Sequence, residues 1–340
     1  MVQHAARPRC GLAFGDEQVQ AGRLKIGTRG SPLALAQAHE VRRRLMMAHG
    51  WDEAAVEIRT FKTSGDRIQD RSLAEAGGKG LFTKEIEEAL LSGDVDLAVH
   101  SMKDMPTELP AGLSMAALLP REDVRDAFIS TRWTSLADLP QGAVVGTSSL
   151  RRRAQVQRMR PDVKVVEFRG NVETRLRKLA EGIADATFLA CAGLNRLGQA
   201  DRITAAMPVA DMLPAVAQGA IGIEVRSDDE RSTGFVMSLN HQPTSICVAM
   251  ERAFLARLEG SCRTPIAGLA ELSADGTIRF RGMILSPDGT RCLETSREGP
   301  PERALVMGEE AGQELLDRAG PDFFAKPTAG HGSDASNGGR

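Results

Sequence analysis

Four side chains that can move protons or bind anions follow one short apolar segment of the chain. Residues 95–99 form the apolar run, and the side chains after it are His100, Ser101, Lys103 and Asp104. Such a run is typical of a buried strand, and ligands of open α/β sheets bind at the carboxyl ends of strands. A carboxylate beside an ammonium at that edge indicates acid–base catalysis. For this cluster taken alone, a solvated turn is the simpler interpretation.

Arginines follow three successive predicted strands in the middle of the chain. The strands are expected at 143–146, 163–168 and 186–190, and the arginines after them are Arg151 and Arg152, Arg169 and Arg175, and Arg196. Cations at a helix N-terminus are unfavourable by a few tenths of a kcal/mol each. Arginine binds carboxylates and phosphates through two parallel hydrogen bonds. We therefore expect a pocket for a ligand with several anionic groups, with solvated surface arginines as the alternative.

Strand–loop–helix units position these residues. A strand at 24–27 precedes a helix from Ser31 to about Gly50, in which Ser31 is a good N-cap residue. The N–H groups at such a helix start favour an anion, and Arg29 would add donors. Another helix is expected from Thr83 to about residue 91.

The order of these elements predicts a fold of the α/β class with three domains. One doubly wound α/β domain is expected over 23–119 together with 215–238, and a second over 120–214. Beyond 240, a helix, three alternating strands and a last helix predict a small α+β domain up to 325, with a three-stranded antiparallel sheet.

Composition excludes several classes of protein. The 340 residues are 42% hydrophobic, and no run approaches the ~18 apolar residues of a membrane span. Lys plus Arg is 43 against 45 for Asp plus Glu, and aromatics are only 4%, which argues against a nucleic-acid binder. Residues 1–22 lack the apolar segment of a secretion signal, so we expect an N-terminal extension and a cytoplasmic location. Residues 326–340, rich in Gly, Ser and Asn, are expected to be disordered.

The cysteines indicate reduced thiols. They are odd in number and far apart, at Cys10, Cys191, Cys247, Cys262 and Cys292. Cys262 lies in a predicted loop beside Arg263, which would stabilise a thiolate, although an ordinary loop thiol is the simpler interpretation. His100 has no His or Cys partner at ligand spacing, so no metal site is expected.

Seven segments in one order remove these ambiguities, because together they resemble the porphobilinogen deaminase (hydroxymethylbilane synthase) family over roughly residues 23–325. The segments are KIGTRGSPLALAQA, GGKGLFTKEIEEALLSGDVDLAVHSMKDMPTELP, GTSSLRRRAQ, RGNVETRLRKL, LACAGLNRLG, QGAIGIE and ERAFLARLEGSCRTP. The resemblance implies two α/β domains like those of periplasmic binding proteins, and a small third domain.

The resemblance also implies an activity. Members of the family are transferases of haem biosynthesis that join four porphobilinogen units head to tail, with release of ammonia, into the linear tetrapyrrole hydroxymethylbilane. The chain grows on a covalent dipyrromethane cofactor, expected here as a thioether of Cys262. A monomer without nucleic-acid or membrane partners is expected from the family.

Site residues follow from the resemblance position by position. Asp104 matches the catalytic aspartate. The positions that match cofactor-binding residues, besides Cys262, are Ser31, Lys103, Thr147, Ser149, Arg151, Arg152 and Arg175. Those that match substrate-binding residues are Arg29, Lys79, Arg169 and Arg196. The departures are Glu75 in place of an expected lysine, and Ser261 and Ala217 in place of common glycines.

Two rival functions explain part of the sequence. A two-lobed binding module that only holds a polyanion would need the arginines, but it would need neither Asp104 nor a third domain that carries Cys262. A nucleic-acid binder would also use arginines, but the chain is close to neutral and poor in aromatics.

Overall fold

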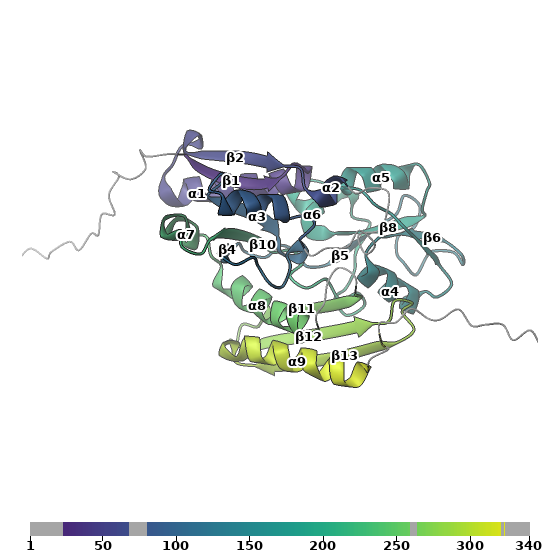
Figure 1. Ribbon diagram of the computed structural model, residues 1–340. Helices are drawn as coiled ribbons and strands as arrows, with labels where there is room; N and C mark the ends of the chain where they lie inside the picture. Colours follow the sequence, from purple (N-terminus) through teal and green to yellow (C-terminus); the bar gives the residue numbers. More distant parts are fainter. Residues whose placement is uncertain (1–22, 68–79, 259–263, 321–322, 324–340) are drawn as a thin grey trace, which may run out of the picture.

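The computed structural model describes residues 23–67, 80–258, 264–320 and 323. Its strands divide among three sheets, two of five strands and one of three. In Figure 1 the first sheet is purple to blue, apart from one green strand that comes from later in the sequence. The second sheet is teal, and the third, below them, is green to yellow. The fold therefore has the α/β class expected from the sequence, with a small antiparallel third unit.

The first sheet has the order β2-β1-β3-β10-β4. Its strands are β2 (Val56–Phe61), β1 (Leu24–Arg29), β3 (Leu97–Ser101), β10 (Ile221–Arg226) and β4 (Leu113–Leu118). β1 runs parallel to β2 and β3, whereas β10 is antiparallel to both of its neighbours. The strand that fills the gap between β3 and β4 thus comes from more than a hundred residues further along the chain.

Helices α1 (Pro32–His49), α3 (Lys84–Leu91) and α7 (Glu230–Met237) cover this sheet, and α2 (Ser64–Arg67) lies past β2. The sequence predicted both ends of α1. The Ser31 hydroxyl accepts a hydrogen bond from the Ala34 N–H at 3.3 Å, and Gly50 ends the helix with a left-handed φ of 67°.

The second sheet repeats this arrangement with the order β7-β6-β8-β5-β9. Its strands are β7 (Lys164–Val166), β6 (Val144–Gly146), β8 (Ala186–Ala190), β5 (Asp126–Ile129) and β9 (Ala205–Ala206). Here β5, which enters from the first unit, is the strand antiparallel to β8. Helices α4 (Leu150–Met159), α5 (Val172–Ala180) and α6 (Cys191–Arg196) follow β6, β7 and β8.

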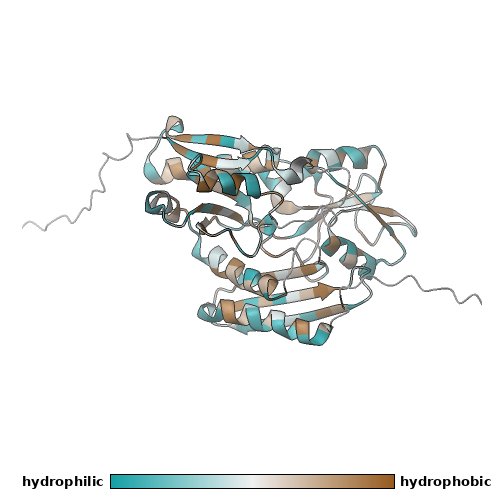
Figure 2. Cartoon of the chain, in the orientation of Figure 1, coloured by the Kyte–Doolittle hydropathy of each residue, from teal (hydrophilic) through white to brown (hydrophobic). Residues whose placement is uncertain are grey.

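The third sheet is the antiparallel meander β11 (Ile266–Leu272), β12 (Ile278–Leu285) and β13 (Cys292–Gly299). Helices α8 (Gln242–Arg257) and α9 (Ala304–Ala319) pack on it. Phe254 of α8 meets Phe280 of β12 with ring centroids 5.0 Å apart. Figure 2 shows hydrophobic and hydrophilic residues together on α9, as expected of a helix with one buried side.

The element predictions were correct in type and differed mainly at the ends. The strand predicted to end at residue 99 continues to Ser101, because His100 and Ser101 pair with Gly222 and Ile221 of β10. Thr83 stands before α3 as predicted, but its side chain makes no capping bond to the helix start. In the part of the chain that the structure describes, no helix combines the length and apolar character needed to cross a membrane.

Candidate active site

Ser101 lies at the carboxyl end of β3, and Lys103 and Asp104 follow it in the chain. The strand turns into a short 3-10 helix, η2 (Met102–Asp104), in which the Met102 N–H donates to the Ala220 carbonyl at 3.0 Å. Ser101 is held from the side, because the Gln37 amide donates to its hydroxyl at 2.8 Å. Lys103 and Asp104 are both partly accessible. The strand end therefore presents an ammonium and a carboxylate from adjacent residues of one held turn.

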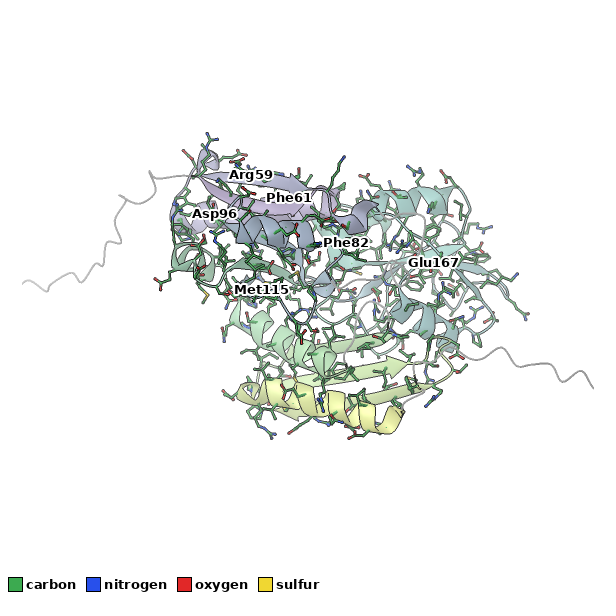
Figure 3. The ribbon with its side chains drawn as sticks, viewed as in Figure 1. Arg59, Phe61, Phe82, Asp96, Met115 and Glu167 are labelled. Atoms are coloured by element: carbon green, nitrogen blue, oxygen red, sulfur yellow. The ribbon has the colours of Figure 1, made fainter. Side chains whose placement is uncertain are left out.

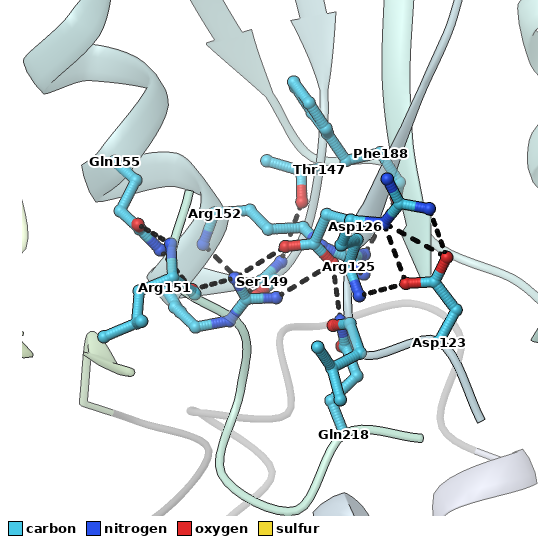
Figure 4. A network of polar contacts seen from close by, with 12 residues as sticks. Asp123, Arg125, Asp126, Thr147, Ser149, Arg151, Arg152, Gln155, Phe188 and Gln218 are labelled. Atoms are coloured by element: carbon cyan, nitrogen blue, oxygen red, sulfur yellow. Dashed lines mark hydrogen bonds and ion pairs between the residues drawn. The ribbon is translucent and has the colours of Figure 1, made fainter. Parts of the chain in front are cut away.

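A buried ion cluster lies at the corresponding edge of the second sheet (Figure 4). Asp126, at the start of β5, accepts hydrogen bonds at 2.7 Å from Nη1 of Arg151 and from Nη2 of Arg152. The Gln218 amide donates to the same carboxylate at 3.0 Å. Asp126 is 0% exposed and each arginine 5%. The anion in front of this helix start is thus a side chain of the protein itself.

The electrostatics of Asp126 follow from this geometry. Burial alone would raise the pKa of the carboxyl, but the charges of Arg151 and Arg152 and their hydrogen bonds hold it well below its usual range. Burial also lowers the pKa of Arg151, although the Asp126 charge opposes that shift. The second guanidinium donates further, from Nη1 of Arg152 to the Phe188 carbonyl at 2.8 Å. Most donors of both arginines are therefore engaged within the protein.

The pKa values of Lys103 and Arg175 show that charges of one α/β unit act on the other. Burial of the Lys103 ammonium lowers its pKa to about 8, with Asp104 opposing the shift and Arg152 adding to it, although part of the residue remains accessible. Burial lowers the pKa of Arg175 to about 10, and the charges of Arg152 and Arg169 add to this while Asp104 opposes it. The Asp104 carboxylate of the first unit therefore lies within electrostatic reach of the Arg175 guanidinium of the second.

The other predicted site residues lie on the loops around this cluster. Arg29, at the end of β1, stacks over the ring of Phe82 at 4.2 Å, and Phe82 lies beside α2 (Figure 3). Thr147 is buried and accepts a hydrogen bond from the Ser149 N–H at 3.2 Å. Ser149 in turn caps α4 by accepting from the Arg152 N–H at 3.4 Å. Ser149 and Thr147 therefore fix the loop that leads into α4, the helix that carries Arg151 and Arg152.

Arg196 does not join the cluster through any described contact. Its guanidinium donates to the Gly219 carbonyl at 2.9 Å and lies 3.6 Å from the Glu40 carboxylate of α1. Burial lowers the pKa of Arg196, while Glu40 opposes the shift. This arginine links α6 of the second unit to the first. Lys79 and Cys262, together with Glu75, Ser261, residues 1–22 and residues 326–340, lie outside the described residues.

Sequence reasoning missed Asp126 and Gln218, and it treated Ala217 only as a replaced glycine. The signal for Asp126 was a charged residue at the head of the apolar strand DAFI. Ala217 has φ 58°, a left-handed conformation that explains why a glycine would suit the position. The unpredicted residues all belong to segments that return the chain from one unit to the other.

These residues fit a ligand with several carboxylates. Lys103 and Arg175 are cations whose pKa values are lowered by burial and by neighbouring cations, and a bound carboxylate would offset both effects. Across the described ranges, no group of three or more His, Cys, Asp or Glu side chains has an arrangement suited to a metal ion. Buried Cys191 and Cys247 have pKa values raised to about 11 by burial, so they are poor nucleophiles.

Fold and site together define a two-lobed α/β protein in which a carboxylate and several cations lie at strand ends. The model of the porphobilinogen deaminase dipyrromethane cofactor-binding domain matches residues 24–233, and that of the porphobilinogen deaminase C-terminal domain matches residues 245–317. The chain belongs to the porphobilinogen deaminase family. It is accordingly a transferase of tetrapyrrole synthesis, and its cofactor is dipyrromethane.

Relatives with curated names agree with this family. The chain is 56% identical to the chloroplastic porphobilinogen deaminase of Pisum sativum over 326 residues, which is 94% of this chain and 88% of the relative. It is 58% identical to porphobilinogen deaminase of Paracoccus denitrificans over 301 residues, with 88% and 96% covered. Among solved structures, a methionine-binding lipoprotein of Bacillus subtilis, described as putative, matches with TM-score 0.41 and 14% identity, over 65% of this chain and 92% of that one.

Proposed function

We propose that this chain joins four porphobilinogen units head to tail into hydroxymethylbilane at the carboxyl end of β3, with Asp104 as the catalytic residue. The observation that carries this proposal is the position of Asp104 beside Lys103 in the turn that follows β3, within electrostatic range of the Arg175 guanidinium. It joins a carboxylate able to move protons and a set of carboxylate-binding cations in one site, although they come from different units of the fold.

Asp104 has a role that follows from its chemistry. A carboxylate can accept hydrogen bonds from pyrrole N–H groups, stabilise positive charge that develops when ammonia leaves, and take up or return a proton. The partly accessible position at the end of β3 leaves it open to a ligand. Lys103, next in the same 3-10 turn, would hold a carboxylate of the cofactor while Asp104 acts on the ring.

The arginines and hydroxyls have a binding role in this proposal. Each pyrrole unit carries an acetate and a propionate, so negative charge accumulates as the product grows. Positions proposed to bind these groups on the cofactor are Ser31, Lys103, Thr147, Ser149, Arg151, Arg152 and Arg175, and on the substrate Arg29, Lys79, Arg169 and Arg196. For Arg151 and Arg152, the carboxylate of Asp126 already takes several donors. Their contribution to a ligand is therefore a field of net positive charge and the remaining donor directions.

The dipyrromethane cofactor supplies the pyrrole end on which the product is extended, and we propose that it is attached by a thioether to Cys262. We also propose domain limits of 23–119 with 215–238, 120–214 and 240–325, which place each sheet in its own domain. We also propose that the chain is a monomer and lies in the cytoplasm.

Intact-protein mass spectrometry tests the attachment, and a turnover assay tests the reaction. The purified chain and Cys262→Ser are compared, before and after incubation with porphobilinogen. A mass excess of two linked pyrrole units that depends on Cys262, with hydroxymethylbilane and ammonia formed, would support the proposal. A chain that binds porphobilinogen but gains no covalent mass and forms no product would instead be a binding module.

A further inference from the structure

A second group of titratable side chains is buried in the first unit, on β3, on its neighbour β10 and on helix α3. Nε2 of His100 on β3 lies 2.9 Å from Oε2 of Glu224 on the neighbouring strand β10. Glu224 is 0% exposed and His100 5%. Glu87 of α3 is also buried, 7% exposed, and the charge of Glu224 raises its pKa. Two carboxylates thus share one buried region with a single imidazole.

The hydrogen bonds of this group are incomplete for two ionised carboxylates. Among the described residues, no hydrogen-bond partner reaches the buried Oε1 of Glu87 or the buried Oε1 of Glu224. Burial is the main cause that raises the pKa of Glu87; a hydrogen bond from Thr83 and the charge of His100 oppose it without cancelling it. Leaving two negative charges in this region would be strongly unfavourable, whereas one added proton removes a charge and supplies a donor.

Among the described residues, no cation forms an ion pair with Glu87 that would remove this imbalance. Burial lowers the pKa of Arg252 of α8, and the charge of Glu224 opposes that shift. The titratable side chains on the strands packed against α3 are Lys25 and Arg29 of β1, His100 of β3, and Glu224 and Arg226 of β10, with none on β4. The guanidinium of Arg226 is bonded elsewhere, to the Leu90 and Val95 carbonyls at 2.8 and 2.7 Å.

His100 and Arg252 hold the two ends of the segment that carries Asp104. His100 is at the start of that segment and is fixed to Glu224. At its other end, Nη2 of Arg252 donates to the carbonyls of Pro106 and Thr107 at 2.7 and 3.1 Å. Glu224 therefore contacts the residue at one end of the segment directly, and its charge acts on the arginine that holds the other end.

We propose that Glu87 is held as a neutral carboxylic acid in the folded chain, and that Glu87, Glu224 and His100 form a buried network that positions the segment with Lys103 and Asp104. The catalytic part of this inference rests on the proposed function of Asp104, but the protonation of Glu87 does not. These are positioning residues, because none of them reaches the site itself.

The protonation is tested by the unfolding free energy of wild type and Glu87→Gln as a function of pH. A carboxyl whose folded pKa is raised binds its proton more tightly in the folded chain, so its contribution is complete below about pH 4.5 and is lost as the pH rises through the folded pKa. Wild type should therefore lose stability relative to Glu87→Gln over that rise. The matched control is Glu88→Gln, at the exposed next position of α3, which should track wild type. Parallel curves for wild type and Glu87→Gln would overturn the proposal.

Two further measurements complete the test. The first detects the protonated carboxyl in wild type, so it remains informative if Glu87→Gln fails to fold, and the second tests the positioning role. Infrared spectra of wild type at neutral pH should contain a carbonyl band of a protonated carboxylic acid that Glu87→Gln lacks, and its absence from wild type would overturn the proposal. Glu224→Gln should lower kcat roughly 10–100-fold with KM and cofactor mass unchanged, and Glu224→Asp should restore part of it. Unchanged kcat in Glu224→Gln would refute positioning. Absence of turnover in wild type would instead refute the proposed function and leave the stability test valid.

Discussion

Asp126 and Arg152 are joined by two hydrogen bonds inside the second α/β unit, from Nη2 at 2.7 Å and from Nε at 3.1 Å, both to Oδ1 of the carboxylate. Arg152 lies in the first turn of α4, whereas Asp126 begins the strand that enters from the first unit. The pair therefore ties the arginine helix to the crossover between units. A cluster that would bind an external anion is organised around an internal one.

Removing that internal anion should be costly. Asp126→Asn leaves Arg151 and Arg152 buried without their counter-charge, and breaking a buried ion pair from one side costs about 3–5 kcal/mol. Urea unfolding monitored by circular dichroism measures the loss. The control is Asp123→Asn, whose partner Arg125 is largely exposed, so that less than about 1 kcal/mol should be lost. Equal losses in both variants would show that burial of the Asp126 cluster adds nothing.

Acid stability should depend on the same carboxylate. Because the pKa of Asp126 is depressed in the folded chain, its contribution is present above the ordinary value of 3.8 and declines as the pH falls below it. Wild type should lose this part of its stability in acid, while Asp126→Asn, which never had it, should show a flatter acid limb. Identical acid limbs would contradict the depressed pKa.

Asp104→Asn should keep the fold and lose nearly all turnover, by a factor of roughly 10²–10⁴, because an amide can neither accept nor return the proton. Turnover and thermal unfolding are measured together. Asp94→Asn, an exposed position before the same strand, is the control and should retain wild-type rates. Near-normal turnover in Asp104→Asn would remove the assigned catalytic role.

Activity should decline in alkali, because Lys103, which we assign to cofactor binding, loses its positive charge. Its folded pKa of about 8 means that the ammonium is lost as the pH rises past that value, so carboxylate binding should decline there. In Lys103→Arg the guanidinium stays charged, and the decline in kcat/KM should move to higher pH. Stability moves the opposite way: relative to Lys103→Met, wild type should gain stability between about pH 8 and 10.5, because only the unfolded chain still holds the proton there. Superimposable pH profiles of Lys103→Arg and wild type would contradict this.

The third unit should depend on one buried ion pair for its attachment. Glu251 of α8 is 0% exposed and accepts hydrogen bonds from Arg121 at 2.6 and 3.0 Å, and from the N–H groups of Ala217 and Ala270 at 2.6 and 2.8 Å. Arg121→Leu leaves the buried Glu251 carboxylate without its counter-charge, so the free energy of unfolding should fall by about 3–5 kcal/mol. Arg279→Leu, at an exposed surface pair on β12, should cost under about 1 kcal/mol. A denaturation scan compares them; similar losses would mean that Arg121 contributes no more than a surface arginine.

Sequence patterns were sufficient for most of the elements and for the strand ends that carry the candidate site, although helices α6 and α7 were not predicted. Ser31 before Pro32 predicted the start of α1, and the apolar run at 95–99 predicted β3, because capping and burial are local properties of the chain. The position of Lys103 and Asp104 past that strand followed directly. These features need only residues that are close together in the sequence.

The partners of the charged residues could not be predicted in the same way. Which anion faces Arg151 and Arg152 depends on the antiparallel pairing of β5 with β8, and the bond between His100 and Glu224 depends on β10 lying beside β3. Both strands arrive by crossovers between units, and a one-dimensional pattern does not specify which strands a crossover brings together. The sequence therefore showed which charged residues follow the strands, but it did not show that Asp126 would pair with Arg151 and Arg152, or Glu224 with His100.

The position of β10 has a consequence for synthesis on the ribosome. The strand lies between β3 and β4, yet residues 221–226 are made only after the whole second sheet. Until they emerge, β3 and β4 have no strand between them, and the edge of β3 that pairs with β10 stays unpaired. The second unit, whose strands are consecutive in the chain, can close first. The active-site strand is thus completed by one of the last pieces of the two α/β units to be translated.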